Sequence, residues 1–161
     1  MNKITIVKEA AEKAMAAECE RTKCLLARAE KFIAAVIVVA GFQSLNTATL
    51  LESSSQLVKI LCCASLAVLS LALLFGFYSL RLKGYASYPR GDKLWESLKA
   101  ENISEDAADQ AIIQLLLKTR EQNAKLNDAK SNSLFWCGLL FVVGFLVTVS
   151  SHLLFAIANS Q

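Results

Sequence analysis

The sequence predicts an all-α membrane protein with three transmembrane helices. Three segments, 32–51, 60–80 and 134–158, contain no Asp, Glu, Lys or Arg, and each is long enough to span a bilayer, which takes about 20 apolar residues. If the amino terminus lies in the cytoplasm, 16 of the 17 basic residues lie on that side, and only Lys59 lies outside. The positive-inside rule expects this asymmetry, so we predict an N-in, C-out topology.

The composition agrees with this class. Of the 161 residues, 55% are hydrophobic, and they gather in three blocks instead of recurring at the period of a soluble amphipathic helix. The first 31 residues carry many charges and lack the compact apolar region of a signal peptide, so we expect no cleaved leader. The five cysteines and the single histidine show no zinc-ligand spacing, so we predict structural thiols and no metal site.

Residues 1–31 are predicted to form a cytosolic amphipathic helix. Its weakly apolar face consists of Ile4, Val7, Ala11, Ala14 and Met15, at spacings that recur on one side of a helix. No glycine or proline interrupts the pattern before residue 32, so we expect this helix to continue into the first span. Residues 32–80 then form a transmembrane hairpin, whose two spans are joined by the short external connection 52–56.

Residues 81–133 are predicted to be a cytosolic loop followed by helices. The stretch 81–93 contains the only proline, Pro89, and two glycines, which is typical of a loop. A short helix around Trp95 and Leu98 follows. Asn102 or Ser104 can cap a new helix, and no proline interrupts the sequence from there to residue 158. We therefore expect a long cytosolic helical hairpin whose second helix continues into the third span, 134–158.

Catalysis is not indicated. The sequence has no nucleophile elbow, phosphate-binding loop or paired-histidine motif, and its carboxylates lie on solvated helix faces without an apolar pocket. We therefore expect no enzymatic activity and no cofactor.

Polar residues inside the first and third spans are the more informative feature. In each of these spans, the polar side chains of the outer half share one helix face by their i, i+3, i+4 spacing. Because polar groups facing lipid are costly, both stripes should face protein or water. They either form hydrogen bonds between helices or line an aqueous path. Three helices are too few to enclose a pore, so a channel would need several copies. The pore-lining candidates are Gln43, Asn46, Thr47, Thr148, Ser151 and His152.

Small residues in the spans would allow the close helix packing that such an assembly needs. They are Ala40 and Gly41 in the first span, and Gly138 and Gly144 in the third. Small side chains let helix backbones approach each other closely in membranes.

Basic residues just inside the membrane form a second pattern. Arg21, Arg28 and Lys31 lie along one helix face, and Lys118, Arg120 and Lys125 lie on the long helix before the third span. One reading is that these side chains extend toward anionic headgroups. The other is that they form the walls of a cytosolic crevice for an anionic ligand such as a phosphate backbone.

A polar ridge precedes the third span. Asn123, Asn127 and Ser131 recur every four residues, so they share one face of the helix. Either solvent covers this ridge or a neighbouring helix packs against it, and the sequence leaves both interpretations open.

The layout resembles that of small bacterial anti-phage membrane effectors. A polar helix, Glu121–Lys130, runs into an apolar span behind a transmembrane hairpin, which is similar to the effectors of CBASS-like and Pycsar-like systems and most similar to the Hailong-type channel effector. This resemblance implies an oligomeric ion channel of the bacterial inner membrane, with a tetramer favoured. A nucleotide or single-stranded nucleic acid made by a partner nucleotidyltransferase would restrain it. Opening would depolarise the cell and abort infection.

Two other functions fit the same features. A non-conducting membrane anchor or assembly subunit would use the polar stripes only to hold its helices together and the cytosolic segment as a docking surface. A holin-like lytic protein fits the size and the number of spans, but it does not need the long cytosolic segment between the second and third spans.

Overall fold

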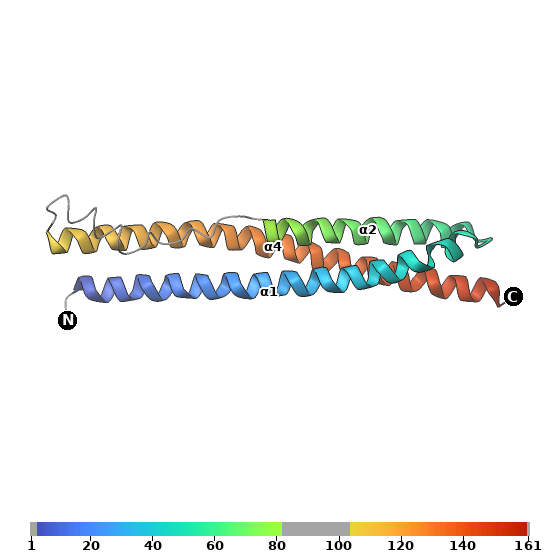
Figure 1. Cartoon of the computed structure of the whole chain (residues 1–161), viewed down its shortest axis with the longest axis horizontal. Coiled ribbons are helices and arrows are strands. Elements are labelled where there is room, and N and C mark those ends of the chain that lie inside the picture. Colours follow the sequence, from blue (N-terminus) through green and yellow to red (C-terminus); the bar gives the residue numbers. More distant parts are fainter. Residues whose placement is uncertain (1–2, 82–103, 161) are drawn as a thin grey trace. The chain divides into compact units, whose positions relative to one another are not determined.

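The computed structural model describes residues 3–81 and 104–160, and the fold is all-α (Figure 1). It contains three helices: α1 (Lys3–Leu51, 49 residues), α2 (Gln56–Arg81, 26 residues) and α4 (Glu105–Asn159, 55 residues). The predicted continuity of the N-terminal helix with the first apolar segment is confirmed, as is that of α4 with the last one. The predicted loop 81–93 beyond Arg81, the short helix around Trp95 and the cap Asn102 lie outside the described residues.

Serines precede the starts of both later helices. Ser104 comes directly before α4, and its carbonyl oxygen accepts the backbone N–H of Ala108 at 3.0 Å, as expected of the residue that caps a helix. In the connection 52–55, the carbonyl oxygen of Ser55 accepts the N–H of Lys59. The hydroxyl of Ser53 accepts the N–H of Ser55 at 3.2 Å. The predicted short connection between the first two apolar segments is confirmed.

Internal contacts divide the chain into two units. Unit 1 comprises Met1–Leu25 and Leu82–Ala129, and unit 2 comprises Leu26–Arg81 and Lys130–Gln161. In unit 1, α1 and α4 lie side by side and run in the same direction (Figure 1). Lys8 pairs with Asp109 near the start of both helices, and Thr22 bonds Asn127 further along both. Among the described residues of this unit, Ala11, Met15 and Leu116 form a buried apolar cluster.

Unit 2 contains parts of all three helices, with α2 antiparallel to the other two. Val36 of α1 packs with Leu69 of α2 and with Phe141 of α4. Further along α1, Leu50 packs with an earlier residue of α2 and a later residue of α4, Cys62 and Phe155. The sequence numbers therefore rise together on α1 and α4 and fall on α2.

Buried residues in unit 2 follow the seven-residue repeat of coiled coils. In α2 they alternate four and three positions apart: Val58, Cys62, Ser65, Leu69, Ala72, Gly76 and Ser79. This 3.5-residue period keeps one seam of a helix against its neighbours, as in left-handed helix packing. The seam positions can be occupied by small or polar residues as well as by large apolar ones.

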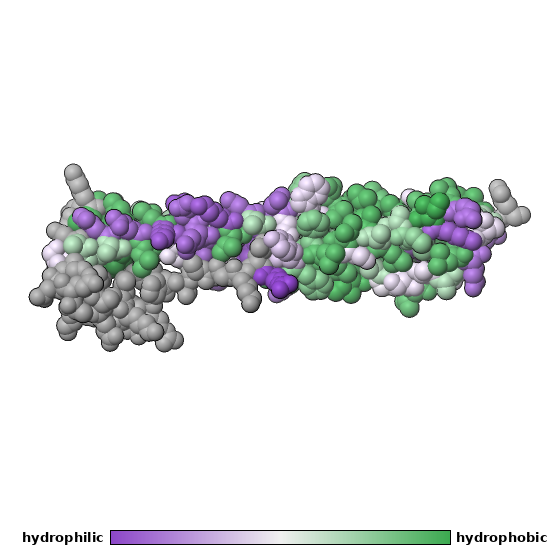
Figure 2. All heavy atoms as spheres, turned by 90° about the horizontal axis from the view of Figure 1, so that it is seen from above, coloured by the Kyte–Doolittle hydropathy of each residue, from purple (hydrophilic) through white to green (hydrophobic). Residues whose placement is uncertain are grey.

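The surface of unit 2 is apolar, whereas polar residues are buried inside it. Leu45, Val38 and Leu74 are 85%, 71% and 64% exposed, while Gln43 and Ser151 are 0% exposed. Figure 2 shows hydrophobic residues covering most of the visible face of this unit, and hydrophilic residues interspersed along unit 1. Such an inverted distribution is unfavourable in water, because large exposed apolar patches mark surfaces that are normally covered.

Two helices are long and apolar enough, by length and composition, to cross a membrane: α2, and the Ala107–Asn159 part of α4. Only 28% and 17% of their most apolar 18-residue stretches are buried, whereas the core helix of a soluble protein is mostly buried. The predicted first span, 32–51, is not among them, so the structure supports two spans and not three. This segment is helical throughout, but polar residues such as Gln43 and Asn46 make its outer half less apolar than the other spans.

The close helix packing in unit 2 gives a direct test. A Cβ atom at Gly76 would lie 2.7 Å from Cγ1 of Ile33, whereas one at Gly138 would lie at an ordinary contact distance of 3.4 Å from Cζ of Phe32. We expect Gly76→Ala to lower the midpoint of thermal unfolding in detergent, because overpacking costs about 1–3 kcal/mol. Gly138→Ala is the matched control and should leave the midpoint unchanged or raise it, because alanine is the better helix former. Equal midpoints for the two variants would contradict this packing.

Candidate functional site

A buried polar layer crosses unit 2 between two apolar clusters. Gln43 lies seven residues after Val36 and seven before Leu50, and Thr148 lies seven after Phe141 and seven before Phe155. The seven-residue repeat therefore places Gln43 and Thr148 at the same level of the parallel pair α1 and α4. The Gln43 side chain donates from Nε2 to Sγ of Cys62 on α2, at 3.4 Å. All three side chains are at least 97% buried.

Hydroxyl groups in and beside this layer donate to carbonyl oxygens of their own helices. Thr148 donates to Gly144 at 2.9 Å, Ser151 to Thr148 at 2.8 Å and Ser65 to Cys62 at 2.8 Å. A hydroxyl has only one proton, so these groups have none to offer a second acceptor. The layer is therefore rich in acceptor oxygens and poor in free donors.

Two buried acceptor atoms in unit 2 have no partner among the described residues. One is Oε1 of Gln43, and the other is Nε2 of His152. Nδ1 of His152 lies 2.9 Å from the carbonyl oxygen of Thr148, and because a carbonyl only accepts, Nδ1 carries the proton in the neutral ring and Nε2 is left as an acceptor. The ring also stacks on Phe42, with 5.2 Å between centroids.

The structure divides the six pore-lining candidates into two groups. Gln43, Thr148 and Ser151 are buried inside unit 2, whereas Asn46, Thr47 and His152 are less buried. Asn46 donates to the carbonyl of Phe42, and Thr47 donates to that of Gln43. In the single chain, the stripes thus face protein, as one of the two sequence interpretations expects. Whether an assembly turns any of them toward water stays a prediction.

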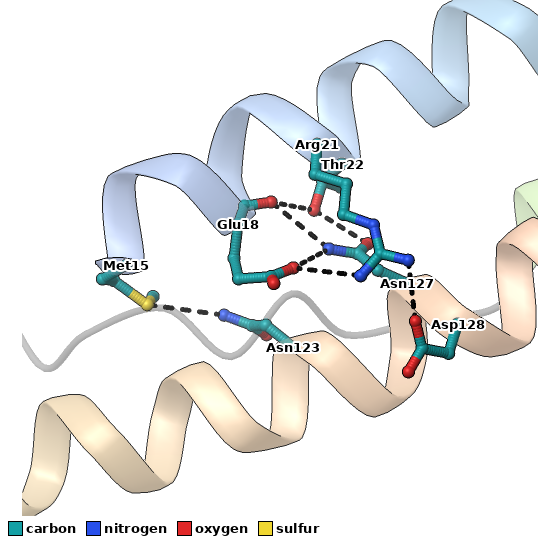
Figure 3. Close-up of polar contacts among 7 residues, drawn as sticks. All are labelled: Met15, Glu18, Arg21, Thr22, Asn123, Asn127 and Asp128. Atoms are coloured by element: carbon teal, nitrogen blue, oxygen red, sulfur yellow. Dashed lines mark hydrogen bonds and ion pairs between the residues drawn. The ribbon is translucent and has the colours of Figure 1, made fainter. Parts of the chain in front are cut away.

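In unit 1, a polar network joins α1 to α4 (Figure 3). The amide of Asn127, which is 1% exposed, donates to the carboxylate of Glu18 at 2.9 Å and to its carbonyl oxygen at 3.3 Å. The hydroxyl of Thr22 lies 3.0 Å from Oδ1 of Asn127 and 2.9 Å from the carbonyl oxygen of Glu18, so these two acceptors share its proton. Both the nitrogen and the oxygen of the buried Asn127 amide therefore take part in hydrogen bonds.

Flanking contacts extend this network along the helix pair. Asn123, one turn earlier, is also 1% exposed, and its amide lies 3.8 Å from Sδ of Met15. On the surface, Arg21 contacts Asp128 at 2.7 Å and Glu18 at 3.8 Å. Asn123 and Asn127 of the predicted polar ridge therefore pack against a neighbouring helix, while Ser131 is half-buried.

The six anion-binding candidates do not form one cluster. All of them are exposed; four belong to unit 1, and Arg28 and Lys31 belong to unit 2. Arg21 already pairs with carboxylates, and Lys125 pairs with Glu121 at 2.7 Å, which holds the pKa of Glu121 below its ordinary value through a hydrogen bond and the nearby positive charge. Within the described ranges, no acidic partner faces Lys118, Arg120, Arg28 or Lys31.

Some residues of these sites were not predicted from the sequence. They are Glu18 and Thr22 in unit 1 and Cys62 in unit 2. Thr22 and Cys62 each belong to a series of buried positions that recur every seven residues along their helix. This repeat could have indicated that both residues face a neighbouring helix. Among the described residues, no three His, Cys, Asp or Glu side chains gather as a metal site would require.

Comparison of the chain with protein-family models, with curated proteins and with solved structures found no match. The part of the chain that the structure describes is all-α, with three helices, of which two are long and apolar enough to cross a membrane.

The polar network in unit 1 can be tested at Asn127. We expect Asn127→Ala to destabilise the helix pair by about 1–3 kcal/mol, because Glu18 and Thr22 lose their partner in a buried setting. Hydrogen exchange followed by mass spectrometry should show faster exchange in residues 8–25, with residues 56–81 unchanged. Gln122→Ala, which changes an exposed amide on the same helix, is the control. Equal exchange in the two variants would show that the network does not hold the pair together.

Proposed function

We propose that this chain is an N-in, C-out protein with three membrane spans that assembles with copies of itself into an ion channel. In this proposal it acts as an anti-phage effector of the bacterial inner membrane, and its opening depolarises the infected cell. The apolar surface of unit 2 supports the membrane location, including the part of α1 that carries the exposed Val38 and Leu45. The distribution of basic residues supports the orientation.

The observation that carries the proposal is the buried acceptor at Gln43. In a membrane, a polar group without a partner is costly, and apolar residues would fill the same seam position without this cost. A side chain that carries such a cost is a candidate for function. We infer that the layer of Gln43, Thr148 and Ser151 is closed in the single chain and contributes to a hydrated path when the helices rearrange in the assembly.

A free face on α1 supports self-assembly. Gly41 is exposed, and nothing lies within 4 Å of the position where its Cβ would be. A glycine on the outer surface of a membrane helix lets a neighbouring helix approach closely. By contrast, Gly144 packs closely against α2 of its own chain, because a Cβ there would lie 2.8 Å from Leu69. The contact between copies is therefore assigned to the Gly41 face of α1, with a tetramer as the proposed assembly.

Gating is proposed to begin in unit 1. Both α1 and α4 supply residues to the two units without a break in the helix, so a change in the pairing of α1 with α4 in unit 1 has a direct route to unit 2. A nucleotide or single-stranded nucleic acid that binds one arrangement better than the other shifts the population toward it. Lys118 and Arg120 are the proposed contacts in unit 1, because they are exposed and have no carboxylate partner among the described residues.

A non-conducting anchor or assembly subunit is the second candidate function. It is favoured by one observation: Gln43 points into the chain's own bundle and joins α1 to α2 through its bond to Cys62, whereas Thr148 and Ser151 bond carbonyl oxygens of their own helix. Polar side chains at such positions hold membrane helices together, with about 1 kcal/mol for each hydrogen bond.

The two functions separate in the variant Gln43→Leu. Purified protein is recorded in planar bilayers, with Ser70→Leu, a change at an exposed position of α2, as the control. For a channel, we expect Gln43→Leu to alter single-channel conductance while the assembly keeps its size on gel filtration, because leucine removes the polar group from the path. Ser70→Leu should conduct like the native chain. A short single-stranded oligonucleotide added to the cytosolic side should reduce the current.

Two outcomes would contradict the channel. The first is an absence of conductance from the native chain at any protein concentration that gives assembled protein. The second is loss of the assembly in Gln43→Leu, which would show that the layer only packs helices and would support the anchor.

A further inference from the structure

An apolar groove with a positively charged end lies on α2 in unit 2. It has a volume of about 560 Å³ and is lined by Leu71, Leu74, Phe75, Phe77, Tyr78 and Arg81. The aromatic and aliphatic members are 36% to 64% exposed, so their side chains are available to an apolar ligand. Arg81 and the phenol of Tyr78 supply the polar groups at one end.

The length of the groove matches one leaflet of a bilayer. Ten residues separate Leu71 from Arg81, which corresponds to about 15 Å along a helix. The hydrocarbon core of a bilayer is about 30 Å thick, so one leaflet accounts for about 15 Å. A lipid chain that starts at the level of Arg81 would end near Leu71.

Charge at the same end of unit 2 favours an anionic headgroup. Arg81 is the last residue of α2, and among the described residues no carboxylate pairs with it. Arg28 and Lys31, near the start of unit 2 on α1, are also exposed. A guanidinium binds phosphate oxygens through two parallel hydrogen bonds, and Tyr78, three residues earlier on the helix, can donate a third.

We propose that this groove binds an anionic diacyl phospholipid of the cytoplasmic leaflet. Its phosphate contacts Arg81 and Tyr78, and one acyl chain lies along Phe77, Leu74 and Leu71. The inference rests on the membrane location and orientation in the proposed function, but it does not depend on conductance. It assigns to α2 a specific lipid contact and not only a place in the bilayer.

The test is lipid binding by the full chain in mild detergent. The protein is mixed with equal amounts of phosphatidylglycerol and phosphatidylcholine, and native mass spectrometry counts the lipids retained by each chain. We expect a preference of about fivefold for phosphatidylglycerol, which is the size of one contact between a basic side chain and an anionic lipid near a membrane surface. Arg81→Gln should abolish this preference, Tyr78→Phe should reduce it, and Lys23→Gln should retain it because Lys23 is an exposed residue of unit 1 and lies outside the groove.

Three results would overturn the inference: equal retention of the two lipids by the native chain, an equal loss of preference in Lys23→Gln and Arg81→Gln, or displacement of phosphatidylglycerol by soluble glycerol phosphate. Different experimental results would refute the proposed function. A chain that does not fractionate with membranes refutes the membrane location, and a chain that prefers phosphatidylglycerol but does not conduct refutes only the channel.

Discussion

The structure depends on the parallel seam between α1 and α4. In each unit, residues of these two helices pack against each other, and in each unit an amide side chain is buried between helices. A buried amide fixes the pairing of two helices, because sliding one past the other removes its partners and leaves it unsatisfied. Asn127 has this role in unit 1, where Glu18 and Thr22 satisfy it. In unit 2, the buried amide of Gln43 bonds Cys62 of α2, and its oxygen has no partner among the described residues.

Different contacts hold the helices together in the two units. In unit 1, the described residues Ala11, Met15 and Leu116 form a buried apolar cluster, and the polar network around Asn127 adds specific contacts between α1 and α4. In unit 2, many large apolar side chains are exposed, in addition to the two buried apolar clusters around Val36 and Leu50, and exposed apolar patches of this kind mark surfaces that are normally covered. Tight packing around Gly76 and Gly144 brings the helices together there. Among the described residues, the buried amide of Asn127 is bonded through both its nitrogen and its oxygen, and that of Gln43 only through its nitrogen, which is why our proposal places the rearrangement that would open a path in unit 2.

Much of the fold could be predicted from the sequence, because its signals are local. The absence of charges, the run without proline and the serine before Glu105 define where helices begin, continue and end. The direction in which each polar residue points could not be predicted in this way. The spacing of Gln43, Asn46 and Thr47 places them on one face, but only the partner helices decide that Gln43 is on the seam and Asn46 beside it. The pairing of Arg21 with Asp128, across 107 positions, is equally invisible to a local pattern, and it leaves Arg21 less available to a ligand than its exposed position suggests.

The central claim is that α1 crosses the membrane together with α2 and α4. The most direct measurement compares two full-length single-cysteine proteins in spheroplasts, using a maleimide that does not cross membranes. One retains only the native Cys24, which is exposed in unit 1, and the other carries only Ser54→Cys, an exposed position between α1 and α2. The account predicts that Ser54→Cys is labelled in intact spheroplasts and that Cys24 is labelled only after permeabilisation. Equal labelling of the two positions before permeabilisation, or protection of both, would place both ends of α1 on one side and contradict the account.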